Sequence, residues 1–240
     1  GQSVTVQDTA DVTVYSIIMA DMEGAAPPRR RTVCVGRETG FSAWVIPEIE
    51  GAFYWHTTDP FNLRVAGRGR QVAVAGMSPS TSAGSSPLVL TFVPACPMAF
   101  YGQRVHAMTV AGVDIVAGDG GDPDLVICTG VGGETAQYVA KPLPTNVPGP
   151  LSFSWHVSSH DKLRTVGACD KRELRCREAG NGPSNNIGAE IISVMCAPDG
   201  LSLSEGAEDS LAVTVAAVQI LDSEGADLPW AYIGAEQSRE

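Results

Sequence analysis

The stretch Leu151-Ser-Phe-Ser-Trp-His-Val157 alternates apolar and polar residues without a break. In an extended strand, successive side chains point to opposite faces of the sheet. The four apolar side chains therefore share one face, and the two serines and His156 share the other. This alternation predicts a β-strand with one face in a core and one face in water.

Short apolar runs rich in Val, Ile, Thr and aromatic residues recur along the whole chain. They cover residues 12–20, 40–46, 71–75, 88–94, 105–110, 125–129, 151–157, 187–196 and 211–221. Clusters of Gly, Pro, Ser and Asn separate them, as expected of turns. The pattern predicts an all-β, antiparallel β-sandwich, and a chain of 240 residues fits one domain over residues 1–240.

Two segments allow more specific structural predictions. Residues 211–221 are apolar on both faces, so we expect a central strand that is covered on each side. Residues 170–178 are strongly charged and lie between Cys169 and Gly180. They form either a charged hairpin or a single helical turn.

The composition favours a compact and acidic protein. Hydrophobic residues make up 44% of the chain and charged residues 18%, with a net charge of −11. Such a surface repels nucleic acid and anionic membranes, and it favours encounters with basic partners. No apolar run is long enough for a membrane helix. The first residues do not resemble a signal peptide, so we expect any such peptide to have been removed.

Six cysteines are spread along the chain without a C-x-x-C pair, which argues against a zinc site. They are Cys34, Cys96, Cys128, Cys169, Cys176 and Cys196. An even number at long spacing favours three disulfides in a secreted, extracellular protein. The alternative is a set of buried thiols in a cytosolic protein. Six cysteines allow fifteen pairings, and the sequence does not choose among them.

A search for catalytic and cofactor motifs favours a protein that is not an enzyme. There is no G-x-S-x-G nucleophile motif. Glu134 stands where a phosphate-binding loop has lysine, so residues 130–135 are interpreted as a turn. His156 and His160 would lie about 13 Å apart on a strand, at ~3.3 Å per residue, which argues against zinc. Residues 118–124 form a solvated acidic loop, with an interaction surface or a calcium site as alternatives. We expect no metal and no cofactor.

Bulky aromatic residues gather in two short segments, residues 41–45 and 53–55, although aromatics are only 6% of the chain. They either fill a core or act as anchors for a protein partner. The candidates for partner binding are Trp44, Tyr54, Trp55 and Phe61.

Two cysteine-bearing segments resemble the secreted poxvirus immune evasion family. Residues 10–34 read as a strand, a Pro-Pro turn and Val33-Cys34, and residues 88–97 as an apolar strand that ends in Cys96-Pro97. Phe41-Ser-Ala-Trp44-Val45 is similar to a W-x-x-W-V-like motif of parapoxvirus members that inhibit granulocyte-macrophage colony-stimulating factor (GM-CSF) and interleukin-2, with phenylalanine at the first tryptophan.

The resemblance implies a homodimeric, disulfide-stapled decoy that binds GM-CSF and interleukin-2 and blocks receptor engagement. A chemokine trap is the first alternative, although residues 38–87 lack the acidic loop of the chemokine-binding relatives. A structural β protein, such as a capsid or adhesion module, is the second. An enzyme of unrecognised type is the third.

Overall fold

The computed structural model of the chain describes residues 14–28, 31–96, 100–129, 135–179 and 187–217. The described part consists of strands, their connections and one short 3-10 helix. The strands are β1 (Ser16–Asp21), β2 (Thr32–Cys34), β3 (Glu38–Ile46), β4 (Gly51–Thr57), β5 (Leu63–Ala66), β6 (Gln71–Gly76), β7 (Ser86–Pro94), β8 (Gly102–Ala117), β9 (Val126–Thr129), β10 (Ala136–Leu143), β11 (Leu151–Val157), β12 (Leu163–Val166), β13 (Glu173–Glu178), β14 (Gly188–Pro198) and β15 (Ala207–Ala217), and the helix is η1 (Leu203–Glu205).

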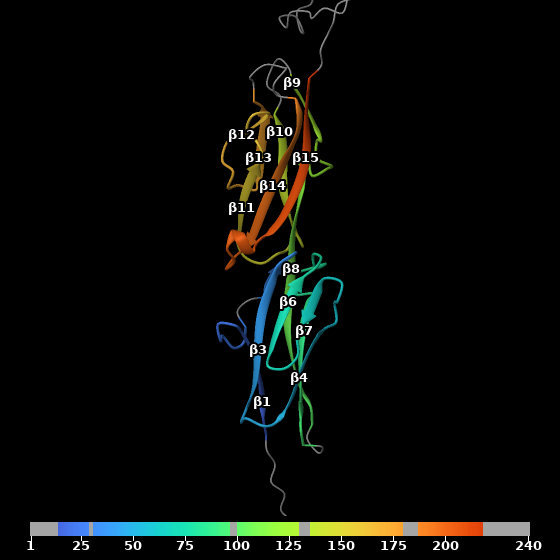
Figure 1. Cartoon of the computed structure of the whole chain (residues 1–240), viewed down its shortest axis with the longest axis vertical. Coiled ribbons are helices and arrows are strands. Elements are labelled where there is room, and N and C mark those ends of the chain that lie inside the picture. Colours follow the sequence, from blue (N-terminus) through green and yellow to red (C-terminus); the bar gives the residue numbers. More distant parts are fainter. Residues whose placement is uncertain (1–13, 29–30, 97–99, 130–134, 180–186, 218–240) are drawn as a thin grey trace, which may run out of the picture.

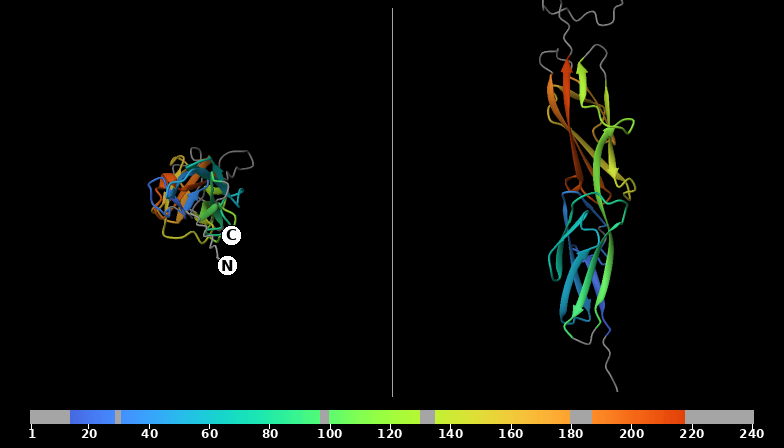
Figure 2. Two further views of the ribbon diagram at one scale, coloured as in Figure 1. Left: turned by 90° about the horizontal axis from the view of Figure 1, so that it is seen from below. Right: turned by 90° about the vertical axis from the view of Figure 1, so that its right-hand side faces the viewer.

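The strands assemble into two sandwiches that lie end to end along the long axis of the molecule (Figures 1 and 2). In the first sandwich, the sheet β1-β3-β6-β5 packs against β4, β7, β2 and the first half of β8. In the second, the other half of β8 joins β10, β13 and β12, and this sheet packs against β11-β14-β15-β9. β8 therefore belongs to both sandwiches.

The second sandwich repeats the strand pairing of the first. Both contain a parallel pair, β2 with β8 and β9 with β15, among antiparallel neighbours. The register repeats as well, because residue pairs of the first sandwich have counterparts in the second. The pair Val33–Val110 corresponds to Ile127–Val215, Phe41–Val72 to Tyr138–Leu174, and Thr57–Leu88 to Val157–Ile192. The chain therefore contains a structural duplication.

Each sandwich has its own hydrophobic core with a tryptophan at an equivalent place. Trp55 and Trp155 are 8% and 5% exposed. The indole Nε1 of Trp55 donates to the Gly69 carbonyl at 2.9 Å, and that of Trp155 donates to the Lys171 carbonyl at 2.8 Å. A buried indole needs such an acceptor. The two cores are therefore stabilised by the same side chain in the same way.

The structure confirms the all-β, antiparallel sandwich class. Trp155 and Val157 of β11 are buried, whereas Ser152 and His156 are exposed, as the alternation predicted. Residues 170–178 form the charged hairpin, because β13 pairs with β12. No described segment is a helix with the length and hydropathy that a bilayer crossing requires.

Three expectations differ from the structure. We expected one sandwich over residues 1–240, and the strand pairing gives two that share β8. Apolar periodicity locates strands but does not say how they group, and both groups have the same pattern. We expected both faces of residues 211–221 to be covered, but Ala212 and Thr214 are exposed in β15, and residues 218–221 lie outside the described part. No disulfide joins any of the six cysteines.

Candidate functional site

The joint between the two sandwiches is built around β8. This strand pairs with β7 from Gly102 to Met108, with β2 from Thr109 to Ala111, and with β10 from Gly112 to Ala117. Its 16 residues span roughly 50 Å at ~3.3 Å per residue. The backbone thus passes from one core to the next inside a hydrogen-bonded ladder and not through a linker.

Contacts across the joint link Cys34 at the end of β2, and Arg37 after it, to the second sandwich. Cys34, at the end of β2, is buried within the core cluster of the second sandwich. The Arg37 side chain donates through Nε to the carbonyl oxygen of Gly206 at 3.2 Å. A Cβ on Gly206 would lie only 2.7 Å from the carbonyl oxygen of Cys196, so this close approach requires glycine.

The six cysteines occupy three kinds of place. Cys34 and Cys196 lie in the joint, and both are buried. Cys176 is fully buried in the second core, with Cys169 packed against that core. Cys96, after β7, and Cys128, in β9, are exposed. β9 lies near the outer end of the second sandwich, and the end of β7 lies near the outer end of the first (Figure 1).

Burial sets the acidity of the inner thiols. The pKa of Cys176 is raised above its ordinary value to about 12, first by desolvation and then by the nearby Cys169 thiol. The pKa of Cys196 is likewise raised to about 11, because desolvation and then Cys34 raise it and Arg172 opposes them. These thiols are therefore protonated at neutral pH and react slowly as nucleophiles.

The four aromatic candidates for partner binding do not form one surface. Tyr54 and Phe61 are 51% and 86% exposed. Trp44 is half-buried on the outer face of the opposite sheet, across from Ile18 of β1. Trp55 lies in the core, because neighbouring residues on a strand face opposite ways and Tyr54 faces outward. For Trp55, core filling is the interpretation that its burial supports.

The outer face of β4, β7 and the first half of β8 carries no carboxylate, lysine or arginine. Tyr54, Val93 and Val105 expose 51%, 42% and 65% of their surface there. The face consists of Ala52, Tyr54, His56, Pro87, Val89, Thr91, Val93, Gln103, Val105 and Ala107. We call it the uncharged face. The equivalent positions of the second sandwich include Ser152, Ser154, Ser193, Ser210 and Glu208, so that face is more polar.

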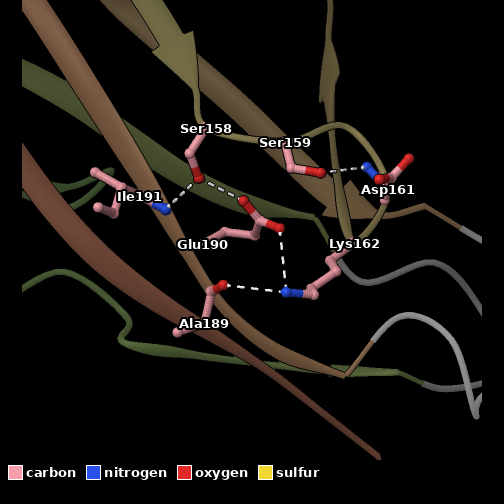
Figure 3. A network of polar contacts seen from close by, with 7 residues as sticks. All are labelled: Ser158, Ser159, Asp161, Lys162, Ala189, Glu190 and Ile191. Atoms are coloured by element: carbon pink, nitrogen blue, oxygen red, sulfur yellow. Dashed lines mark hydrogen bonds and ion pairs between the residues drawn. The ribbon is translucent and has the colours of Figure 1, made fainter.

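A polar network fastens the loop after β11 to β14 (Figure 3). The hydroxyl of Ser158 donates to Oε2 of Glu190 at 2.5 Å and accepts from the backbone N–H of Ile191 at 2.9 Å. Lys162 lies 3.6 Å from the other oxygen of Glu190 and donates to the Ala189 carbonyl. Glu190 is only 3% exposed, so its buried charge is compensated by these partners.

In the first sandwich, the loop after β4 is also held by a hydroxyl and a carboxylate, but the two groups have exchanged places between loop and strand. The loop provides a carboxylate, Asp59, which accepts from Ser86 of β7 at 2.5 Å and from Asn62 at 2.8 Å. Ser86 stands at the register position of Glu190, as the pairing of β7 with β4 and of β14 with β11 shows. The hydroxyl lies on the strand in one sandwich and on the loop in the other.

The joint and the duplication were missed by our sequence analysis, although a signal exists. Phe53-Tyr-Trp55-His56 followed by Leu63-Arg64 recurs as Phe153-Ser-Trp155-His156 followed by Leu163-Arg164. Thr109-Val110 recurs as Thr214-Val215, and Val33-Cys34 as Ile127-Cys128. A search for internal repeats finds these before any strand is assigned.

Histidine and acidic side chains do not gather into a metal site. His156 and His160 are both exposed, on β11 and on the loop after it. Among the described residues, no group of three or more His, Cys, Asp or Glu side chains is arranged to hold a metal ion. Residues 130–134 of the glycine-rich turn lie outside the described part.

Comparisons with known proteins concern the fold. No protein-family model and no curated protein matches the chain. Among solved structures, it is similar to the D00-D0 domain of intimin, with a TM-score of 0.42 and 9% identity over 83% of this chain and 99% of that one. It is also similar to a chain in the structure of Dpr2 Ig1-Ig2 in complex with DIP-Theta Ig1-Ig3, with a TM-score of 0.30 and 9% identity over 85% of this chain. The present chain spans 65% of the length of that Dpr2–DIP-Theta chain.

Proposed function

We propose that the chain is a non-enzymatic structural rod, in which two repeated sandwiches hold their outer faces at a fixed spacing and orientation. The observation that carries this proposal is the uninterrupted course of β8 through both sandwiches. It deepens the expectation of a structural β protein into a specific mechanical role.

The described joint contains no flexible linker that could act as a hinge. Domain boundaries commonly fall in exposed, flexible linkers, and relative motion is then the default. Here the boundary lies within a strand whose backbone is hydrogen-bonded to β7, then to β2, then to β10. Bending at this place would break ladder hydrogen bonds and expose Cys34, which is 1% exposed.

Electron paramagnetic resonance distance measurement tests the rod. Spin labels on the exposed thiols of Cys96 and Cys128 report on the two sandwiches, and Cys169→Ser removes the half-buried third thiol. We expect one narrow distance distribution. A matched control inserts six Gly and Ser residues between Ala111 and Gly112 and should broaden the distribution. A broad distribution in the chain without the insertion would contradict the rod.

A second candidate function, capture of a protein partner, is favoured by the uncharged face. Exposed Tyr and Val side chains on a sheet without formal charges provide the apolar centre that protein interfaces require. Association through this face should depend little on salt. That property fits the GM-CSF and interleukin-2 hypothesis better than a trap for basic chemokines, which would depend on the net charge of −11.

A binding assay against GM-CSF, interleukin-2 and CC chemokines at two salt concentrations tests this second candidate. Tyr54→Ser, which introduces the residue found at the equivalent position of the second sandwich, should weaken binding by about tenfold or more. Ser154→Ala is the matched control and should leave binding unchanged. Binding to chemokines alone with strong salt dependence, or no binding at all, would refute capture by the uncharged face. Secretion stays a prediction of the cysteine pattern and of the sequence resemblance, and a homodimer stays a prediction of the resemblance alone.

A further inference from the structure

Two cysteines from different sandwiches meet in the joint. Cys34 closes β2 of the first sandwich, and Cys196 lies near the end of β14 of the second. They are 1% and 3% exposed, and they belong to one apolar cluster together with Ala111 and Ala207. Cys34 and Cys196 thus bring a thiol from each sandwich into one buried cluster, which also contains Cys176.

The backbone on both sides of this pair is rigidly held. Cys34 is paired with Ala111 in the β2–β8 ladder, and its carbonyl accepts from the Arg37 N–H at 3.0 Å. Cys196 lies between Phe153 of β11 and Ala207 of β15. The hydrogen bond from Arg37 to Gly206 then joins the segment that follows Cys34 to the start of β15. Neither cysteine is on a free loop.

Cys34 also contributes to the electrostatic surroundings of Cys196. Cys34 is among the groups that raise the pKa of Cys196, after desolvation. The two thiols share one buried apolar cluster, in which charges are screened poorly. The other charged group that acts on Cys196 is Arg172, which precedes β13 and works in the opposite direction.

We propose that Cys34 and Cys196 form a disulfide that locks the two sandwiches together. The oxidant is a small-molecule disulfide. The thiolate of one cysteine attacks it, forms a mixed disulfide and releases one small thiolate. The second cysteine loses its proton to solvent and attacks the mixed disulfide, which releases the second small thiolate. Two protein thiols are oxidised and one small disulfide is reduced to two thiols.

The bond would tie β2 to β14 across a large part of the chain and so constrain the unfolded state. It would make the stiffness of the joint depend on the redox state of the surroundings. The repeat provides an internal comparison, since Cys128 stands in β9 at the register position of Cys34 in β2, opposite Ala216 as Cys34 is opposite Ala111. Cys128 is exposed and should not join this bond.

Mass spectrometry tests the pairing. The full chain is incubated folded with oxidised glutathione, quenched with acid, alkylated in denaturant and digested with trypsin. We expect the peptide of residues 32–37 to be joined to the peptide that contains Cys196, and dithiothreitol to separate them. Recovery of the residue 32–37 peptide alkylated, bound only to glutathione, or joined to another cysteine would overturn the proposal.

Denaturant unfolding of oxidised and reduced protein gives an independent measurement. The oxidised chain should unfold at a higher denaturant concentration than the reduced chain. Cys34→Ala and, as a second variant, Cys196→Ala should each abolish this difference, whereas Cys128→Ala should keep it. A difference that survives both joint variants, or that Cys128→Ala removes, contradicts the pairing. The rod itself is tested separately, since a narrow distance distribution under reducing conditions does not require the bond.

Discussion

The two sandwiches share one strand order and one register, but they differ in the residues that provide equivalent polar contacts. Both bury a tryptophan whose indole donates to a carbonyl. Both also hold the loop that follows the tryptophan's strand by a hydrogen bond between a hydroxyl and a carboxylate. The carboxylate comes from the loop in the first and from the strand in the second. Backbone geometry therefore fixes where a polar pair is needed, but not which partner provides the charge.

A second difference lies in the cores. Phe41 of the first sandwich corresponds to Tyr138 of the second, and Val74 corresponds to Cys176. The strand pairing of β3 with β6 and of β10 with β13 gives this correspondence. All four side chains are buried. The second core therefore contains two groups that can lose a proton, where the first contains none at these positions.

The largest expected effect concerns the tryptophan that the sandwiches share. Trp155→Ala should lower the free energy of unfolding by about 3–5 kcal/mol, because it leaves a cavity and an unpaired carbonyl on Lys171. Trp55→Ala should have an effect of similar size. Because both sandwiches share β8, each variant should shift a single transition followed by circular dichroism. Two separate transitions, of which only one moves, would show that the sandwiches unfold independently.

The next prediction concerns the pH dependence of stability, which should differ between the two cores. The folded chain holds the Cys176 proton more tightly than the unfolded chain does, because burial raises its pKa to about 12. Burial also raises the pKa of Tyr138. Stability is therefore unaffected by these groups below about pH 9, and above it falls by about 1.4 kcal/mol per pH unit for each group that titrates only when unfolded.

Cys176→Val, which introduces the residue of the first sandwich, should flatten this alkaline loss. Urea unfolding at a series of pH values from 7 to 11 measures the change. The reciprocal control, Val74→Cys, should add a similar loss to the first sandwich. An alkaline slope that Cys176→Val leaves unchanged would assign the loss to other groups.

The exchanged polar pair gives a smaller effect. Glu190→Ser alone should destabilise by about 2 kcal/mol, since it leaves Lys162 and Ser158 without their carboxylate. Adding Ser159→Asp rebuilds the arrangement of the first sandwich, in which Asp59 of the loop meets Ser86 of the strand. The double variant should regain about half of the loss. Additive effects of the two substitutions, measured in a double-mutant cycle, would contradict the equivalence of the two networks.

Much of this architecture was predictable from residues, and part of it was not. The alternation in residues 151–157 predicted the burial of Trp155 and the exposure of His156. The sharing of β8 was not predictable from alternation, because a 16-residue strand and two shorter strands have the same period. Tyr54 and Trp55 could be assigned to opposite faces from sequence, but which of them faced the core depended on the sheet packed against β4.

The smallest expected effect concerns one hydroxyl group, which is present at Tyr138 and absent from the equivalent residue Phe41. Tyr138 donates its hydroxyl to the Asp124 carbonyl at 3.0 Å, and the equivalent Phe41 has no such group. Tyr138→Phe should therefore fit without rearrangement and lower the free energy of unfolding by about 1 kcal/mol. Phe41→Tyr should cost more, about 1–3 kcal/mol, because a buried hydroxyl would enter a core that evolved without a partner for it. Equal effects of the two substitutions in thermal unfolding would mean that the first core already contains an acceptor at this position, and that the two sandwiches are more alike than their side chains indicate.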